Sequence, residues 1–251
     1  MQRYQGKVIL ITASATGIGL GIAERMAKEG GIVLINSRKE SNVNAAVEKI
    51  NSQGGKAYAF VGNMTDKKAR EQIVQRIEKE FGRLDVLVLN HATSLHFGST
   101  LDTQESMMDK MYETNFKSFI LLIKETYHLL QKAKGNILIN ASYAGYTPDQ
   151  TIGVYSILKT SLIGAVKLFS KEFQFDGIRV NGVAPGLIKT KLSATFWKDK
   201  ANEELAKTNL KIDRLGEPDD IAGVAAFLCS DDAKYVTGET IIVMGTASPR
   251  L

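Results

Sequence analysis

Short segments that are apolar at nearly every position alternate along the chain with longer segments in which apolar residues recur with the period of a helix. The first kind is typical of strands buried on both faces of a parallel sheet, and the second of helices with one buried face. The short segments lie at residues 7–12, 31–36, 56–61, 84–89, 135–141, 177–183 and 239–244. The longer ones include 18–29, 41–53, 66–81, 112–133 and 153–173. This alternation predicts an α/β fold, a doubly wound parallel seven-stranded sheet covered by helices on both faces.

Length and composition narrow the picture further. The 251 residues suit one large domain, and no linker, repeat or low-complexity tract divides the chain, so we expect a single domain over residues 1–251. The net charge of +5 is mild and the basic residues are scattered, which argues against a nucleic-acid partner. The single cysteine, Cys229, excludes an internal disulfide and a multi-cysteine metal site, and its apolar surroundings predict a buried small hydrophobe. No apolar run approaches the roughly 18 residues of a membrane span.

A glycine-containing turn follows the first predicted strand, in the sequence Thr12-Ala13-Ser14-Ala15-Thr16-Gly17-Ile18-Gly19. Gly17 and Gly19 would let the backbone approach a pyrophosphate at the N-terminus of the next helix. The third glycine of the G-x-G-x-x-G fingerprint is replaced by Ile22. The side chains of Thr12 and Ser14 suit bonds either to the turn or to phosphates. Alone, the turn also fits an ordinary strand-to-helix connection.

The end of the second predicted strand indicates which dinucleotide the glycine turn would bind. An NAD site would place an acidic residue there to bind the ribose 2′-hydroxyl, but this chain has Ser37, followed by Arg38 and Lys39. Two cations without a carboxylate suit the 2′-phosphate of NADP. The alternative is a solvated basic loop, and together with the glycine turn we favour NADP.

Tyr155 and Lys159 lie four residues apart in a predicted helix, so their side chains share one face. A neighbouring ammonium group stabilises a phenolate, so we expect Lys159 to lower the pKa of Tyr155 from its ordinary value of about 10. Ser142 follows the fifth predicted strand, where it would reach the same substrate oxygen as Tyr155. Taken singly, the tyrosine–lysine spacing is common and Ser142 is an ordinary turn residue.

In their order and spacing these motifs resemble the short-chain dehydrogenase/reductase family over nearly the whole chain. The motifs that carry the resemblance are the T-x-S-x-x-G-x-G turn, Asn115, Ser142, Tyr155 with Lys159, Arg179-Val180-Asn181 and Pro185-Gly186. The resemblance implies a Rossmann-like fold and the reduction of a ketone or aldehyde, with the hydride taken from NADPH. It implies that Tyr155 protonates the carbonyl oxygen, Ser142 bonds that oxygen, Lys159 holds the nicotinamide ribose, and Asn115 holds a water that resupplies protons.

The cofactor contacts that follow from the residues and the resemblance together are numerous. They are Thr12, Ser14, Gly17, Ile18, Gly19, Ser37, Arg38, Lys39, Asn63, Asn90, Tyr155, Lys159, Pro185, Gly186, Ile188 and Thr190. The family's turn has the form T-G-x-x-x-G-x-G, so Ile22 is no defect.

Three positions depart from the family pattern. Ala13 replaces the first glycine of the turn, and we expect it to adopt a negative φ. Asn63 replaces the aspartate that faces the adenine. The Asn-Asn-Ala-Gly motif becomes Leu89-Asn90-His91-Ala92, which keeps the second asparagine, and we expect His91 to pack beside the cofactor rather than transfer protons.

Further motifs are similar to the peroxisomal NADPH-dependent carbonyl reductases and retinol dehydrogenases of the same family. They lie at 184–190, 214–218, 227–230 and 237–240. This similarity implies reversible reduction of a carbonyl compound such as retinal, with residues 191–212, including Phe196 and Trp197, as a substrate lid. Phe97, Tyr143 and Tyr146 suit either the pocket wall or the core. A 3-oxoacyl-thioester reductase and a catalytically silent NADP-binding protein are the alternatives.

The resemblance also implies a homotetramer assembled through helices 112–133 and 153–173. The apolar positions in the second of these helices exceed the needs of one core-facing stripe, and we expect them in the interface: Leu158, Leu162, Ala165 and Phe169. The chain ends Ser248-Pro249-Arg250-Leu251, similar to a peroxisomal address of the Ser-Lys-Leu type. Because Pro249 lacks a backbone N–H, we expect weak peroxisomal targeting with a cytoplasmic fraction.

Overall fold

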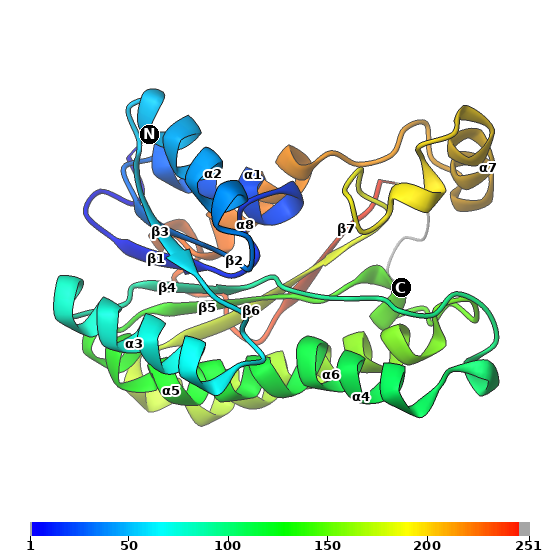
Figure 1. Ribbon diagram of the computed structural model, residues 1–251. Coiled ribbons are helices and arrows are strands. Elements are labelled where there is room, and N and C mark those ends of the chain that lie inside the picture. Colours follow the sequence, from blue (N-terminus) through cyan, green and yellow to red (C-terminus); the bar gives the residue numbers. More distant parts are fainter. Residues whose placement is uncertain (1, 246–251) are drawn as a thin grey trace.

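A seven-stranded parallel sheet forms the centre of the molecule in the computed structural model, which describes residues 2–245. The strand order is β3-β2-β1-β4-β5-β6-β7 (Figure 1). The strands are β1 (Val8–Ile11), β2 (Ile32–Ser37), β3 (Lys56–Val61), β4 (Val86–Leu89), β5 (Asn136–Asn140), β6 (Arg179–Pro185) and β7 (Thr240–Val243). All seven predicted strands are therefore confirmed, as is the doubly wound, Rossmann-like architecture.

Helices cover both faces of the sheet (Figure 1). One layer holds α1 (Gly17–Lys28), α2 (Glu40–Ser52) and α8 (Pro218–Leu228). The other holds α3 (Lys67–Phe81), α4 (Glu105–Tyr112), α5 (Ser118–Ala133) and α6 (Gly153–Glu172), while α7 (Lys200–Leu210) lies beyond the sheet.

Successive residues of a strand point to opposite faces, and this divides the core into two layers. In β1, Ile9 and Ile11 pack on the side of α1 and α8, whereas Val8 and Leu10 pack on the side of α3 and α5. Burial on both faces explains why the strands are apolar at almost every position. Cys229 is buried in the first of these layers, as expected.

The strand order reverses between β1 and β4, which are neighbours although β2 and β3 separate them in the sequence. Connections leave these two strands on opposite sides, which opens a crevice outside their carboxyl ends. Ligands of doubly wound sheets bind at such a switch point. The residues that follow β1, β2, β4, β5 and β6 are therefore brought to one edge.

The predicted helix 112–133 is in fact three pieces, so that prediction is corrected. Helix α4 ends at Tyr112, a π-helical turn covers Glu113–Lys117, and α5 begins at Ser118. The apolar period continues through the turn, so the sequence gives no warning of it. Single π-turns occur mostly at functional positions, and this one contains Asn115.

The interface residues expected on α6 are also corrected. Leu158, Leu162 and Ala165 are buried in the core, and Phe169 packs against it. Helix α4, the π-helical turn, β6 and the 3₁₀ turn after β5 all contact α6, so its buried stripe is wider than a single helix contact requires. These residues therefore pack inside one chain rather than against a second copy.

Two expectations concern what the chain lacks or where it ends. Among residues 2–245, no helix is long and apolar enough to cross a membrane. The proposed address at 249–251 lies outside the described residues, and peroxisomal or cytoplasmic location stays a prediction.

Candidate active site

The turn between β1 and α1 has the shape that the glycines predict. Gly17 has a φ of +59°, and a Cβ on Gly19 would lie 2.6 Å from both the Ala13 carbonyl oxygen and the Asn90 side-chain nitrogen. No larger residue fits at Gly19 without moving backbone. Thr16, the N-cap of α1, makes no capping bond through its side chain, so no side-chain cap occupies the first amides of α1. A glycine cradle and an uncapped helix N-terminus suit a phosphate group.

The hydroxyl groups of Thr12 and Ser14 bond the turn itself, and both residues are fully buried. Ser14 Oγ donates to the Ile11 carbonyl at 2.7 Å and accepts from the Asn36 amide at 3.0 Å. Thr12 Oγ1 accepts from the Asn90 amide at 2.8 Å. Both side chains therefore bond the turn, and their contact with cofactor phosphates stays a prediction.

The expectation of a negative φ at Ala13 is wrong. Its φ is +50°, in the left-handed region that side chains with a Cβ disfavour. The surrounding bonds impose this conformation: the Ala13 amide lies 3.4 Å from Asn36 Oδ1, and its carbonyl accepts from Asn90 Nδ2 at 3.3 Å. The turn therefore carries backbone strain at Ala13 that a glycine would not.

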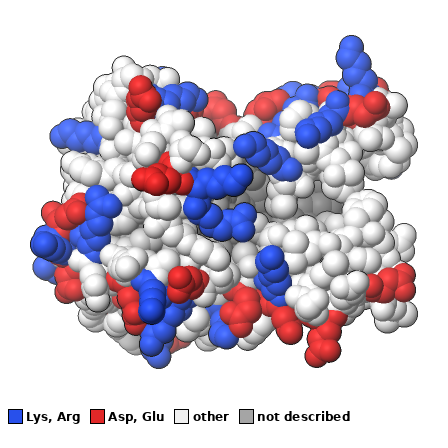
Figure 2. All heavy atoms as spheres, in the orientation of Figure 1, with Lys and Arg blue, Asp and Glu red and all other residues white. Residues whose placement is uncertain are grey.

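Two free cations follow β2. Arg38 and Lys39 are exposed, and Ser37 is partly exposed. Within residues 2–245, neither cation has a side-chain hydrogen bond or ion pair, although most other arginines of the chain do. Figure 2 shows basic side chains gathered beside the hollow on this face. The cations are thus available to an anionic group, as the NADP interpretation requires.

Asn36, which the sequence analysis passed over, organises this edge of the site. Its side-chain nitrogen donates to the carbonyls of Phe60 and Gly62, at 2.9 and 3.1 Å, while its oxygen faces the Ala13 amide. One side chain therefore joins β2 to the loop after β3 and to the glycine turn. Asn63, in that loop, is exposed, and its side-chain oxygen accepts from the Thr65 amide at 3.3 Å.

Asn90 and Asn140 connect the ends of β4 and β5. Asn140 donates through Nδ2 to Asn90 Oδ1 at 2.8 Å, and Asn90 donates in turn to the Thr12 carbonyl at 3.0 Å. The backbone carbonyl of Asn140 accepts from Lys159 Nζ at 2.7 Å. The sequence analysis did not single out Asn140, and an asparagine near the end of the fifth predicted strand was the available signal.

Helix α6 presents Tyr155 and Lys159 on one face, as their spacing predicts. Lys159 Nζ lies 5.5 Å from the centre of the Tyr155 ring, and Lys159 is only 1 % exposed. Ser142, just past β5, hydrogen bonds to Tyr155. The structure thus brings three of the four predicted catalytic residues together.

Asn115 occupies a different position in the network. Its side chain is buried in the π-helical turn and makes two hydrogen bonds with the backbone of Thr93. The Thr93 amide donates to Oδ1 and the Thr93 carbonyl accepts from Nδ2, each at 2.7 Å. The π-turn packs against α6. Asn115 therefore fixes the loop after β4 against the catalytic helix.

The pKa values of the central pair are displaced in opposite directions by one cause. Burial raises the pKa of Tyr155 to about 12, and the hydrogen bond from Ser142 opposes this only partly. Burial also lowers the pKa of Lys159 to about 7. The expected lowering of the Tyr155 pKa by Lys159 is thus not seen in the chain alone, because burial of the phenol is the largest cause of the shift. Near neutral pH the phenol keeps its proton and is suited to donate it.

The segment after β6 lies opposite the glycine turn. A Cβ on Gly17 would lie 3.3 Å from Thr190 Cγ2, which places Thr190 across the crevice. Thr190 is held by Trp197, whose indole nitrogen donates to its carbonyl at 3.1 Å. The Ile188 carbonyl accepts from Ser193 Oγ. These bonds fix the start of the predicted lid against the sheet.

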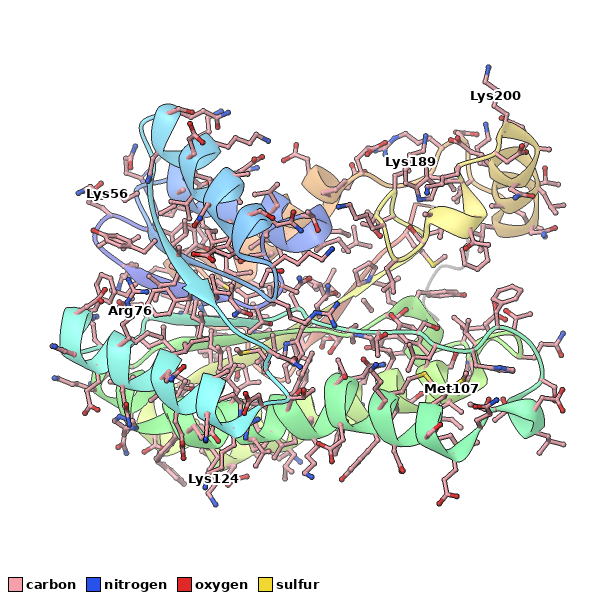
Figure 3. All side chains as sticks on the ribbon, in the orientation of Figure 1. Lys56, Arg76, Met107, Lys124, Lys189 and Lys200 are labelled. Carbon is pink, nitrogen blue, oxygen red and sulfur yellow. The ribbon has the colours of Figure 1, made fainter. Side chains whose placement is uncertain are left out.

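The rest of the predicted lid carries a short 3₁₀ turn and α7. Figure 3 shows Lys200 on this segment and Lys189 just before it, with Met107 of α4 on the other side of the crevice. The rings of Phe97 and Phe196 meet edge to face at 5.6 Å, so they join the loop after β4 to this segment. Tyr146 packs against the core, both Tyr143 and Tyr146 are partly exposed, and a place in the pocket wall stays a prediction for each.

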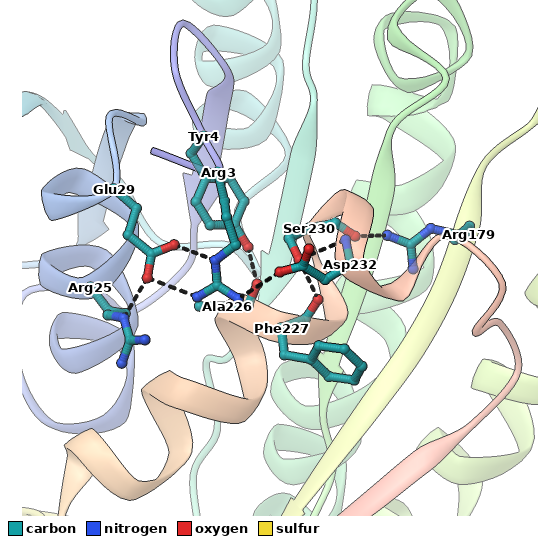
Figure 4. Close-up of polar contacts among 9 residues, drawn as sticks. All are labelled: Arg3, Tyr4, Arg25, Glu29, Arg179, Ala226, Phe227, Ser230 and Asp232. Carbon is teal, nitrogen blue, oxygen red and sulfur yellow. Dashed lines mark hydrogen bonds and ion pairs between the residues drawn. The ribbon is translucent and has the colours of Figure 1, made fainter. Parts of the chain in front are cut away.

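The Arg179 motif lies away from the crevice. The guanidinium of Arg179 donates to the carbonyls of Leu228 and Ser230, both at 2.9 Å, at the C-terminal end of α8. Figure 4 shows this contact beside the ion pair between Arg3 and Glu29. The motif therefore stabilises the opposite edge of the sheet.

A parallel sheet with a phosphate-type turn at its switch point, and a tyrosine–lysine pair beside it, is the arrangement of a nucleotide-dependent oxidoreductase. Residues 12–245 match a family model described as enoyl-(acyl carrier protein) reductase. The chain belongs to the short-chain dehydrogenase/reductase family, whose members are oxidoreductases.

Individual relatives narrow the comparison. The chain is 41 % identical over 246 residues to "Dehydrogenase/reductase SDR family member 4" of Oryctolagus cuniculus, covering 98 % of this chain and 95 % of the relative. It is 38 % identical to the Caenorhabditis elegans protein of that name, covering 100 % and 98 %. Among solved structures, YwfH, named an NADPH-dependent reductase involved in bacilysin biosynthesis, is 26 % identical with a TM-score of 0.92, covering 98 % and 99 %. A Mycobacterium ulcerans short-chain dehydrogenase/reductase, 24 % identical with a TM-score of 0.92, covers 97 % and 90 % and shows the same fold.

Proposed function

We propose that this protein is an NADPH-dependent reductase that converts a ketone or aldehyde into an alcohol, reversibly, of the carbonyl and retinal reductase type. The observation that carries the proposal is a protonated Tyr155 hydrogen bonded to Ser142 and one helical turn from the buried Lys159. The names of the relatives, which join dehydrogenase and reductase, support it.

The residues at the crevice fit NADPH. Gly17, Gly19 and the uncapped amides of α1 would hold the pyrophosphate, because a Cβ would fill that cradle and an anion is favoured at a helix N-terminus. The free cations Arg38 and Lys39, with Ser37, would hold the 2′-phosphate. Asn63 would accept from the adenine amino group.

Other parts of the cofactor would meet the loops after β4 and β6. Asn90 lies at the carboxyl end of β4, where the sheet order reverses. The remaining proposed contacts are Ile18, at the start of α1, and, from the end of β6 onward on the nicotinamide side, Pro185, Gly186, Ile188 and Thr190. YwfH, an NADPH-dependent reductase by name, supports the choice of NADPH over NADH.

Bound NADPH supplies the hydride for the carbonyl carbon. Ser142 binds the carbonyl oxygen and orients it toward Tyr155. Tyr155 then gives its proton to that oxygen as negative charge develops there. Lys159, held by the Asn140 carbonyl, carries positive charge close to the phenolate that forms and stabilises it. A lysine whose pKa lies near 7 exchanges protons readily at neutral pH.

The proton that Tyr155 gives up would be replaced through a water molecule held at the π-helical turn. Both polar atoms of the Asn115 side chain are used by Thr93, so a water molecule would be held by the main chain of Asn115. The turn changes the backbone bonding pattern at this point, which frees carbonyl groups for water. Residues 191–212 would close over the substrate, with Phe97 and Phe196 at the entrance.

NADPH oxidation across a panel of substrates tests the proposal. The panel contains aromatic ketones, α-dicarbonyls, retinal, an acetoacetyl thioester and an enoyl thioester, the last because of the name of the matching family model. Turnover of free ketones or aldehydes at a higher kcat/KM than thioesters supports the proposal. A kcat/KM that rises with acyl chain length on 3-oxoacyl thioesters supports the first alternative. Tight NADPH binding without turnover of any substrate supports a silent binding protein.

We also propose that the protein assembles as a homotetramer through the outer faces of α5 and α6. On α6, Ile157 and Leu168 are 59 % and 58 % exposed, and the space around Gly164 is open. Apolar residues on either side of a small one form a face against which a second helix packs closely.

A further inference from the structure

A buried histidine lies directly beneath the crevice. His91 follows Asn90 at the end of β4 and is only 8 % exposed. Both ring nitrogens have partners: Nδ1 lies 2.8 Å from Thr12 Oγ1, and Nε2 lies 2.7 Å from Ser118 Oγ. The ring also packs against Phe119, with the ring centres 4.4 Å apart. A smaller residue in this place would leave both hydroxyls without these bonds.

The partners of His91 belong to two different parts of the proposed site. Thr12 follows β1 directly, at the start of the glycine turn, where the cofactor phosphates would lie. Ser118 begins α5 immediately after the π-helical turn that contains Asn115. The imidazole is therefore the link between the cofactor side and the catalytic side of the crevice.

A second connection runs toward the catalytic lysine. The ring of Phe119, which the imidazole contacts, lies 6.0 Å from Lys159 Nζ. Movement of the imidazole would thus change the packing beneath Lys159 as well as the position of the π-turn.

The protonation state of His91 determines which atom donates in each of its two side-chain hydrogen bonds. Burial, followed by the charges of Lys159 and Arg70, lowers the pKa of His91 to about 3, so the ring carries one N–H at neutral pH. The Ser118 hydroxyl donates to the Thr114 carbonyl at 2.8 Å and is left to accept from Nε2. The Thr12 hydroxyl then donates to Nδ1, and its 3.2 Å contact with the Val88 carbonyl is the one given up.

We propose that His91 is a positioning residue that locks the π-helical turn and α5 to the glycine turn, so that the two sides of the site keep a fixed relative position. The hydrogen bond between His91 and Thr12 supports cofactor binding, because Thr12 lies beside the glycine turn. The bond between His91 and Ser118 acts on the chemical step, through the π-turn and Lys159. Both effects rest on the proposed function, the first on its cofactor and the second on its chemical step.

Two amide variants separate the bonds. In His91→Asn the side-chain amide reaches the position of Nδ1 and keeps the Thr12 bond alone. In His91→Gln it reaches the position of Nε2 and keeps the Ser118 bond alone. Ser118→Ala removes the second bond from the other side. The matched control is Thr126→Val, because the Thr126 hydroxyl is also fully buried in α5 and donates to a helix carbonyl at 2.7 Å, but has no contact with His91.

We expect a crossed pattern in kinetics and binding. Ser118→Ala and His91→Asn should lower kcat about tenfold, the loss expected from one buried hydrogen bond, and leave the Kd for NADPH within about twofold. His91→Gln should raise that Kd about fivefold and largely preserve kcat. Thr126→Val should change neither.

The double variant His91→Asn/Ser118→Ala should have the kcat of either single variant, because both remove the same bond. Parallel losses of kcat, NADPH affinity and thermal stability in every variant would overturn the proposal and leave His91 a packing residue. So would a kcat loss in Thr126→Val equal to that in Ser118→Ala. If the His91 variants fail to fold, Ser118→Ala against Thr126→Val decides.

A readout without turnover separates this proposal from the proposed function. Amide hydrogen exchange in residues 113–119 should be faster in Ser118→Ala and His91→Asn than in the wild type, and unchanged in Thr126→Val. Wild-type protein that reduces no carbonyl compound would refute the proposed function and leave this comparison intact. Unchanged exchange in Ser118→Ala would refute the positioning role.

Discussion

Tyr155 and Lys159 illustrate how far single residues can be interpreted from spacing. Their separation of four correctly predicted a shared helix face, and Ser142 was correctly expected beside them. The direction of the Tyr155 pKa was wrong, because burial depends on side chains from several elements that the spacing does not reveal. The same limit hid Asn36 and Asn140, whose bonds join segments far apart in the sequence.

The acid stability of the protein should depend on His91. The unfolded histidine has a pKa of about 6.5 and the folded one about 3, so between these values the unfolded state binds the extra proton. The free energy of unfolding should therefore fall as pH is lowered from about 6.5 to 3, with a contribution of up to about 1.4 kcal/mol per pH unit from this group. Urea unfolding at a series of pH values should show a shallower fall in His91→Asn. An equal pH slope in both proteins would contradict the expected neutral imidazole.

Cofactor preference should depend on Arg38. Arg38→Asp removes a partner of the 2′-phosphate and adds a repelling charge, so kcat/KM with NADPH should fall at least about tenfold while that with NADH is kept. The control is Lys56→Asp, which makes the same charge change at the first residue of β3, at the end of that strand away from the crevice (Figure 3). Equal kcat/KM with both cofactors in the wild type would show that the cations after β2 bind no phosphate.

Elements were predicted best where one pattern persists over many residues. All seven strands follow from their apolar runs. The π-helical turn at Glu113–Lys117 was missed because it interrupts the bonding of the helix without interrupting its apolar period. The turn before α1 was identified from Gly17 and Gly19, yet the backbone of Ala13 was assigned the wrong sign of φ, since its bonds to Asn36 and Asn90 are tertiary.

Relief of this strain is measurable. Ala13→Gly should raise the free energy of unfolding by about 1 kcal/mol, because glycine adopts the observed φ of +50° without a steric penalty. The control is Ala23→Gly within α1, where the same substitution should destabilise by at least about 1 kcal/mol through loss of helix propensity and of a buried methyl group. Denaturant unfolding of the three proteins gives both values. Destabilisation of Ala13→Gly to the extent seen for Ala23→Gly would contradict a strained turn.

Strand–helix alternation predicted the complete fold, but it did not predict which residues lie on the outer surface. Composition cannot tell which apolar residues of α6 face the core, and the four expected in the interface proved to be internal. The exposed pair Ile157 and Leu168 became visible only once the sheet had defined the inner face of the helix.

The proposed assembly depends on this outer face. Light scattering of the wild type should report a homotetramer, and Leu168→Arg should give smaller particles because it places a charge in an apolar contact. Leu101→Arg, at a position that is 93 % exposed outside α5 and α6, should leave the tetramer intact. A wild-type monomer at micromolar concentration would refute the assembly.

The central claim is that Tyr155 gives the proton in an NADPH-dependent carbonyl reduction. It is tested most directly by Tyr155→Phe, which removes the hydroxyl and keeps the ring, with NADPH binding measured by fluorescence and kcat measured on the best substrate of the panel. The account predicts a fall in kcat of at least about a hundredfold with an NADPH Kd within about twofold of the wild type. A variant that binds NADPH normally and keeps most of its kcat would contradict the assignment of Tyr155 as the acid.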